Sequence, residues 1–114
     1  MTPTKPPPIK APKYLRAATQ RWFQQVVTEY ALEPHHIRLL ILASETWDRA
    51  CQAREALAKH GLTFADKNGN PRARPEVAIE RDSRIAFARL LRELALDVEP
   101  PETPRPPRTG GQRY

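Results

Sequence analysis

The stretch "KHGLTFADKNGNPRARPE", residues 59–76, decides the fold because it separates two long segments of helical pattern. Gly61 is placed to end the helix before it, and Pro75 suits the first turn of the helix after it. Between them, "LTFAD" and "PRARP" flank "KNGN", in which Asn68-Gly69 favours a tight reversal with positive φ angles. The stretch therefore predicts a short β-hairpin between two helices.

The same stretch has some features of a calcium-binding loop, but its spacing excludes that interpretation. Asp66, Asn68 and Asn70 alternate as calcium ligands do. However, Pro71 stands where such a loop needs a glycine, and Val77 where it needs a bidentate glutamate. Two interpretations of the hairpin stay open: it is a structural connector, or it contacts phosphate or another subunit through three basic residues, Lys67, Arg72 and Arg74.

Apolar residues at helical spacing predict three helices around the hairpin. The first runs from about Lys13 to Tyr30, the second from near Pro34 to about His60, and the third from about Pro75 to Leu94. The first and second are separated at Pro34, because proline disfavours helix in the residue before it. The predicted apolar stripes are Leu15, Ala18, Trp22, Val26 and Tyr30 in the first helix, Ile37, Leu40, Ser44, Trp47, Cys51 and Ala58 in the second, and Ile79, Ala86, Phe87, Leu90, Leu91 and Leu94 in the third.

Two tryptophans, Trp22 and Trp47, lie on these stripes, so we expect both to anchor the core. The segment "IRLLILA" of the second helix is apolar nearly all round, which indicates enclosure by its own chain and by something else. Ile85 projects from the charged face of the third helix. It is either an ordinary surface residue or part of a face that meets a neighbouring subunit.

Proline placement divides the chain into one domain and two arms. Ten of the thirteen prolines fall in two clusters, "TPTKPPPIKAP" and "PPETPRPP", where they favour extended chain. We predict a basic Pro-rich N-terminal arm over residues 1–13, a helical core with the hairpin over 14–98, and a Pro/Arg-rich C-terminal arm over 99–114. The fold class is mainly α, a three-helix core with a short β-hairpin between the second and third helices.

Positive charge is concentrated near the N-terminus. The formal net charge is +6, and residues 1–28 carry five basic side chains and no acidic one. A cationic, proline-extended segment followed by aromatic residues suits attraction to a polyanion, and the alternative is a solubilising tail. We predict nucleic-acid binding through Lys5, Lys10, Lys13, Arg16 and Arg21.

Catalytic constellations are absent from the sequence. It shows no nucleophile with a base, no phosphate-cradling glycine loop and no clustered metal ligands. Cys51 lies in mid-helix without an activating partner, and the adjacent His35 and His36 do not have metal-ligand spacing. No apolar run is long enough to cross a bilayer. We therefore expect a soluble, intracellular protein that is not an enzyme and uses no cofactor or metal.

The body, residues 14–98, resembles the small subunit of tailed-phage terminase. The resemblance lies in the order of "YALEPHHIRLLILASETWDRACQAREALAKHGLTF", "KNGNPRARPE" and "VAIERDSRIAFARLLRELALD". One departure concerns the end of the last helix, where the family often has a glycine before its final leucine and this chain has Ala95. The positions that carry the pattern specify shape: Gly61, Gly69, Pro75, Ala78, Leu91, Glu93, Leu94 and Leu96.

What the resemblance implies is a DNA-packaging adaptor in the host cytoplasm. Such subunits form ring-like homo-oligomers, recognise the packaging site on double-stranded viral DNA and deliver it to the large subunit, which carries the ATPase and nuclease. A ring would multiply the weak attraction of each basic arm. On this hypothesis the hairpin cations are secondary DNA contacts, residues 99–114 dock the large subunit, and the assembly residues are Ile37, Leu40, Ile41 and Ile85.

Two rival interpretations stay open. In the first, the chain is a dimeric helix-turn-helix regulator that uses "YALEPHHIRLL" as its turn. In the second, it is a scaffold whose Pro-rich arms bind protein grooves, without a role on DNA.

Overall fold

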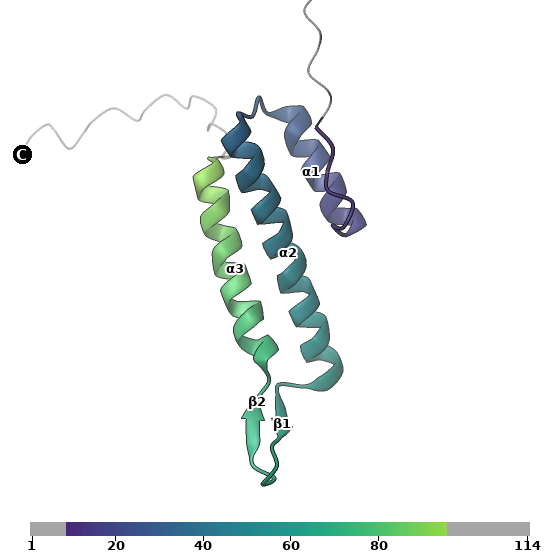
Figure 1. Cartoon of the computed structure of the whole chain (residues 1–114), viewed down its shortest axis with the longest axis vertical. Helices are drawn as coiled ribbons and strands as arrows, with labels where there is room; N and C mark the ends of the chain where they lie inside the picture. The colour runs from purple at the N-terminus through teal and green to yellow at the C-terminus, as the bar shows by residue number, and fades with distance from the viewer. Residues whose placement is uncertain (1–8, 96–114) are drawn as a thin grey trace, which may run out of the picture.

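A computed structural model describes residues 9–95 of the chain. In chain order its elements are α1 (Ala17–Glu29), α2 (Pro34–His60), β1 (Thr63–Ala65), β2 (Pro71–Ala73) and α3 (Pro75–Leu94). Helices α2 and α3 run side by side as a long helical hairpin, the two strands extend from its far end, and α1 lies against the other half of α2 (Figure 1). The predicted mainly α class, with a hairpin between the second and third helices, is confirmed.

Local signals set the ends of α2 as predicted. Pro34 stands in the first turn, and the backbone N–H of Glu33 donates to Nδ1 of His36 at 3.1 Å, which satisfies one group at the helix start. At the other end Gly61 has a φ of 83°, and its N–H donates to the Leu57 carbonyl at 2.8 Å. Glycine adopts this left-handed conformation without the steric cost that a Cβ would bring.

Helix α1 begins at Ala17, four residues later than the predicted start at Lys13. Residues 9–12 run along the helix, and a turn at residues 13–15 leads the chain into α1. Glutamine side chains of α1 hold this segment. Gln24 accepts the Ala11 N–H at 2.9 Å and donates to the Ile9 carbonyl at 3.0 Å. The apolar spacing predicted helix here because Leu15 falls on the helical stripe. Leu15 is indeed buried, but it reaches the core from the segment before the helix.

The β-hairpin pairs Thr63 with Ala73 and Ala65 with Pro71, with exposed side chains throughout. The Gly69 N–H donates to the Asp66 carbonyl at 3.0 Å, and the Asp66 N–H donates to the Asn70 carbonyl at 3.0 Å. These bonds enclose a three-residue loop that needs a positive φ only at its last residue.

The prediction of positive φ angles at both Asn68 and Gly69 is therefore wrong for Asn68. Gly69 has a φ of 79°, whereas the φ of Asn68 is not positive. The reason is the side chain of Asp66, whose Oδ1 accepts the N–H groups of Asn68 and Asn70, each at 2.9 Å. A carboxylate that holds these two N–H groups stabilises the longer loop.

The hydrophobic core lies where α1 packs beside α2 and the end of α3. Phe23 and Leu40 are fully buried there. Toward the hairpin, α2 and α3 pack through small buried side chains, among them Ala50, Ala53 and Ser83. The buried residues of the core cluster are Leu15, Phe23, Val26, Leu40, Ala43 and Leu94.

The expectation that Trp47 anchors the core is wrong, because its side chain is 43% exposed. The buried face of α2 passes through Ala43, Ser44 and Ala50, and Trp47 lies at its edge. Its ring reaches Phe87 of α3 instead, with 5.0 Å between ring centroids. Trp22 is half-buried against the core and also contacts Phe87, at 6.0 Å.

Helix α3 ends in an unusual conformation. Ala95 has φ 52° and ψ 42°, the left-handed region, and its N–H donates to the Leu91 carbonyl at 3.1 Å and the Arg92 carbonyl at 3.0 Å. This is the conformation that a helix-ending glycine adopts most readily. Alanine here is strained by its Cβ, while the burial of Leu94 just before it holds the chain in place.

Candidate nucleic-acid interface

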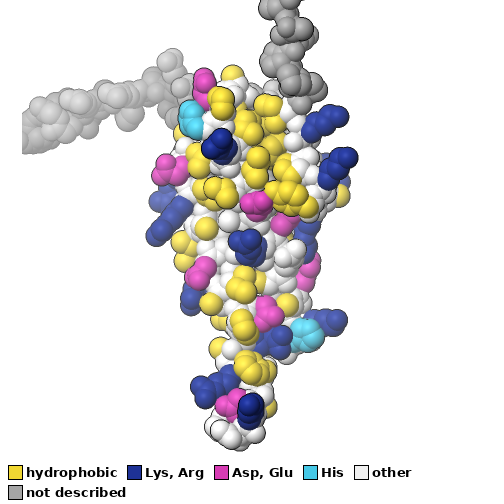
Figure 2. All heavy atoms as spheres, viewed as in Figure 1, with side chains coloured by type: hydrophobic (Ala, Val, Ile, Leu, Met, Phe, Trp, Pro, Cys, Tyr) yellow, Lys and Arg dark blue, Asp and Glu magenta, His cyan; other side chains and the backbone are white. Residues whose placement is uncertain are grey.

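The predicted basic residues form two separate groups. Lys10, Lys13, Arg16 and Arg21 lie on α1 or the segment before it, whereas Lys67, Arg72 and Arg74 belong to the hairpin at the other end of the molecule (Figures 1 and 2). The intervening helix α2 has 27 residues, so it is about 40 Å long at 1.5 Å per residue. Lys5 lies outside the described residues.

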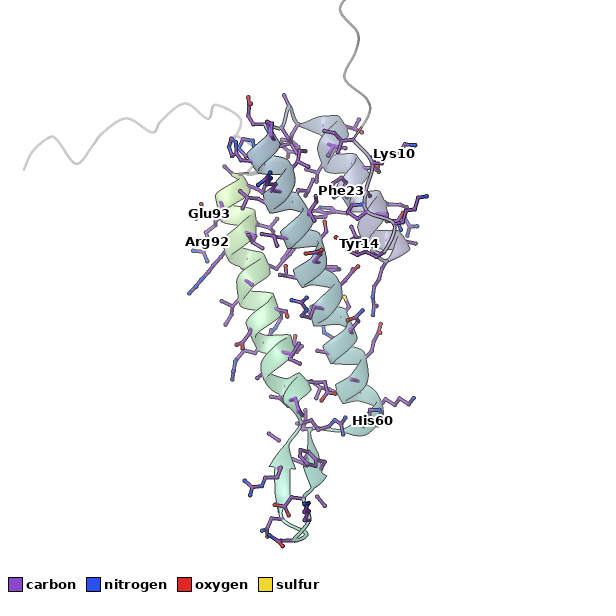
Figure 3. The ribbon with its side chains drawn as sticks, viewed as in Figure 1. Lys10, Tyr14, Phe23, His60, Arg92 and Glu93 are labelled. Atoms are coloured by element: carbon purple, nitrogen blue, oxygen red, sulfur yellow. The ribbon has the colours of Figure 1, made fainter. Side chains whose placement is uncertain are left out.

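Three of the N-terminal cations are exposed: Lys10, Lys13 and Arg21. Within residues 9–95 none of these three side chains forms an ion pair. Figure 3 shows Lys10 on the α1 side of the molecule and Arg92 on the opposite side of α3. Unpaired ammonium and guanidinium groups can neutralise phosphates without first breaking a bond inside the protein.

Arg16 has a different environment from these three. Its guanidinium forms two hydrogen bonds with the Glu55 carboxylate of α2, at 2.7 and 2.8 Å. The bonds raise the pKa of Arg16 above its usual value and lower the pKa of Glu55. Because this pair is internally neutral, Arg16 attaches the N-terminal segment to α2 and adds little to the outward positive charge.

Asp48 is a residue that the sequence did not single out. It is only 7% exposed, and its carboxylate lies at the start of α1, where Oδ2 accepts the backbone N–H of Arg16 at 2.8 Å. Its Oδ1 accepts the Thr19 hydroxyl. A carboxylate at this end of a helix satisfies free N–H groups and interacts favourably with the helix dipole. No local signal marks this role, since the partners are about thirty residues apart in sequence.

A second bond to α2 fixes the basic segment. The Tyr14 hydroxyl donates a short hydrogen bond to the Glu45 carboxylate, which raises the pKa of Tyr14. Tyr14 lies between Lys13 and Leu15, and Leu15 is buried in the core. The backbone that carries Lys13 is thus held by polar contacts and by apolar burial.

The hairpin offers fewer available charges than its sequence indicates. Arg72 Nε donates to Asp66 Oδ2 at 3.0 Å, and this bond, with the backbone N–H groups of the turn, lowers the pKa of Asp66. Arg74 is half-buried and donates to Glu76 at 3.3 Å. Lys67 is exposed at the turn and forms no ion pair with any residue from 9 to 95.

The proposed assembly residues lie at different depths. Leu40 has no exposed surface, and Ile37 and Ile41 are half-buried. Ile85 is 48% exposed on α3, beside an open hollow of about 480 Å³ that it forms with Asp82, Ala86, Arg89 and Leu90. In "IRLLILA" the exposed apolar residue is Leu42, which the sequence did not single out.

Within residues 9–95 the structure places no three His, Cys, Asp or Glu side chains together as a metal site would need. The rings of the adjacent His35 and His36 are tilted by 42° to each other, with 4.1 Å between their centroids. Cys51 is half-buried with a free thiol. None of the helices between Ile9 and Ala95 combines the length and apolar character of a membrane span.

Comparison with protein-family models gives one match. The model described as phage terminase, small subunit, matches residues 17–100. This range begins at the first residue of α1 and includes both strands and all of α2 and α3. Neither the curated proteins nor the solved structures compared with the chain gave a match.

Proposed function

The chain belongs to the phage terminase small-subunit family, whose role is in phage DNA packaging, and on that premise we propose that it is the DNA-binding adaptor of a packaging complex. It binds double-stranded viral DNA at the packaging site as a ring-like homo-oligomer in the host cytoplasm. It then delivers the DNA to the large terminase subunit, which performs the ATPase and nuclease chemistry. The adaptor itself is not catalytic.

The DNA-binding proposal rests on three exposed cations on or just before α1, Lys10, Lys13 and Arg21, which form no ion pair with any residue from 9 to 95. Hydrogen bonds to α2 and to Gln24 hold the segment that carries the two lysines, so the backbone beneath these charges has a fixed position on the protein. Lys5, which lies outside the described residues, is proposed as a further DNA contact. A few phosphate contacts bind weakly in one copy, and repetition around a ring raises the combined affinity through effective concentration.

The hairpin is a secondary contact in this proposal. Lys67 is its available charge, while phosphate would have to compete with Asp66 for Arg72 and with Glu76 for Arg74. The exposed Phe64 and Leu62 beside these cations also suit contact with an adjacent subunit.

Assembly is proposed to use the exposed side chain of Ile85 and the half-buried Ile37 and Ile41. Leu40 would support that surface from inside, since it packs in the protomer core. Residues 99–114 are proposed to dock the large subunit. Deletion of residues 99–114 should then abolish that complex, and an unchanged complex would exclude this role.

The DNA-binding proposal is tested by the salt dependence of the affinity. Replacing Lys10, Lys13 and Arg21 with glutamine should weaken binding, and the slope of log K against log[salt] should flatten by about 0.9 for each phosphate that is no longer neutralised. The matched control replaces Arg38, Lys59 and Arg92, which removes the same charge from exposed side chains that form no ion pair within residues 9–95 and are assigned to neither DNA binding nor assembly. An equal decrease of affinity in both triple variants would show a response to net charge alone and contradict the assigned surface.

Native mass spectrometry with and without DNA tests the assembly. A large closed oligomer supports the packaging ring. A dimer would favour the helix-turn-helix regulator, and a monomer indifferent to DNA would favour the Pro-rich scaffold.

A further inference from the structure

An aromatic cleft lies between α1 and α3, at the edge of α2. Its volume is about 330 Å³, and nearly all of its wall is apolar. Three rings dominate the cleft, with Phe87 in contact with Trp22 on one side and Trp47 on the other. Trp47 keeps 43% of its surface exposed, so a large aromatic face remains available to a partner. Ala18 and Thr19 complete the lining.

The cleft continues toward the end of α3. A second hollow of about 250 Å³ is lined by Leu91 of α3 and by residues of the last turns of α1, among them Gln25 and Glu29. Trp22 belongs to both hollows. Because they share this side chain, the two hollows are neighbours along the α1–α3 boundary, and we call them together the aromatic groove.

The chain supplies a segment whose chemistry suits this groove. Grooves lined with aromatic rings bind polyproline helices, because the preformed extended chain loses little entropy and its rings pack on aromatic faces. The C-terminal cluster "PPETPRPP" occupies residues 100–107. It begins five residues after Ala95, the last described residue.

The chain between Ala95 and Pro100 is long enough for the Pro-rich segment to reach the groove. The Ala95 N–H is bonded to the Leu91 carbonyl, so the C-terminal segment starts one helical turn from Leu91, which lies at one end of the groove. From Leu91 to Phe87 the helix descends about 6 Å. Five extended residues from Ala95 to Pro100 reach about 16 Å. The first prolines can therefore lie on Trp22 and Phe87 of the same chain.

The N-terminal proline cluster is less well placed. Its described residues Ile9 and Ala11 are bonded to Gln24, which is two residues from Trp22 and so about 200° around α1. The N-terminal segment thus approaches α1 from the side opposite the aromatic groove.

We propose that the aromatic groove, formed by Trp22, Trp47, Phe87 and Leu91, binds the Pro-rich C-terminal segment of the same chain, residues 100–107. This intramolecular contact does not require DNA, and it leaves residues 108–114 of the C-terminal arm to dock the large subunit. It sets the position on the core from which the remaining C-terminal residues extend.

Intrinsic fluorescence tests this contact in the full chain, because the chain has two tryptophans and both line the groove. Replacing Pro100, Pro101, Pro104 and Pro106 with alanine should shift the emission to longer wavelength. It should also raise acrylamide quenching about twofold, since a ring covered on its exposed face loses roughly half of its access to solvent. The matched control replaces four N-terminal prolines, Pro3, Pro6, Pro7 and Pro8, and should leave both readings unchanged. Unchanged emission in the C-terminal variant, or an equal change in the control, would overturn the proposal.

Photo-crosslinking identifies the occupant directly. Trp47→p-benzoylphenylalanine in the full chain should crosslink to residues 99–108 on irradiation. A mixture of unlabelled and ¹⁵N-labelled chains separates crosslinks within one chain from crosslinks between chains. Crosslinks within one chain support the proposal, whereas crosslinks between copies, or to a different segment, contradict it.

Discussion

Asp48 of α2 caps the first turn of α1, where its Oδ2 lies 2.8 Å from the backbone nitrogen of Arg16. The same carboxylate accepts the Thr19 hydroxyl, so one buried side chain fixes the start of the helix and its position on α2. Because Arg16 also pairs with Glu55 and Tyr14 with Glu45, the segment that carries Lys10 and Lys13 is attached to α2 at three points. The proposed DNA surface therefore depends on contacts made by α2.

Asp48→Ala should lower the free energy of unfolding by about 1–3 kcal/mol, because it leaves the Arg16 N–H and the Thr19 hydroxyl without their acceptor. Amide hydrogen exchange should also become faster in residues 9–20. Urea denaturation and exchange mass spectrometry measure the two effects. The control is Asp82→Ala, which removes an exposed carboxylate paired with Arg81 and should change stability by less than about 1 kcal/mol. Equal effects of the two substitutions would contradict the capping role.

Ala95→Gly should stabilise the protein by about 1 kcal/mol, because glycine adopts the left-handed conformation of residue 95 without a Cβ clash. In a domain of this size that gain raises the Tm by about 4–8 °C. The control is Ala88→Gly at an exposed position inside α3, which should destabilise by about 1 kcal/mol through its lower helix propensity. Thermal unfolding should show shifts of opposite sign. A lower Tm for Ala95→Gly would show that the strain at this position is negligible.

Leu40→Ala and Ile85→Asp should separate protomer stability from assembly. Leu40 is fully buried, so its truncation should cost about 2–5 kcal/mol in urea denaturation. Ile85 is exposed, and a carboxylate at this position should reduce the mass of the assembly in native mass spectrometry while the helical circular dichroism signal stays unchanged. An assembly that tolerates aspartate at residue 85 would remove this face from the interface.

Arg72→Gln should raise the pKa of Asp66 toward its usual value near 3.8, because the bond from Arg72 is the largest cause of its depression. A carboxyl with a lowered folded pKa stabilises the hairpin fully above the unfolded pKa, and this contribution disappears as the pH falls through the folded pKa. In the unaltered chain the stabilisation by Asp66 should therefore be lost as the pH falls below about 3.8, and this pH-dependent loss should be smaller in the variant, whose folded pKa lies closer to the unfolded one. Carbon-detected NMR titration of the Asp66 carboxyl measures the change. Arg81→Gln, which affects a different carboxylate, should leave the titration unaltered.

Lys13→Gln should flatten the salt dependence of DNA binding more than Arg16→Gln, although each substitution removes one positive charge. Lys13 is exposed without an ion pair among residues 9–95, whereas Arg16 is already neutralised by Glu55. Arg16→Gln should instead accelerate hydrogen exchange in residues 9–16. Fluorescence anisotropy over a salt series compares the slopes. A larger change for Arg16 would show that it leaves Glu55 to bind phosphate.

The sequence by itself determined the bounds of α2 and α3 and the presence of the hairpin. These features depend on the backbone preferences of single residues: Pro34 and Pro75 start helices, Gly61 ends one, and Gly69 completes the turn. Such preferences act within a few residues of chain, so they are readable without knowledge of the rest of the molecule. The order of these elements also carried the resemblance that the family match confirms.

Tertiary structure alone decided which charges are available and which aromatic rings are covered. Arg16 and Glu55 are 39 residues apart in sequence, and Asp48 lies 32 residues from Arg16, so no local pattern indicates either bond. Helical periodicity placed Trp47 on an apolar stripe, yet its exposure was decided by how α1 and α3 pack against α2. Contacts between distant segments depend on the relative placement of whole helices, and this placement is fixed only when the core closes.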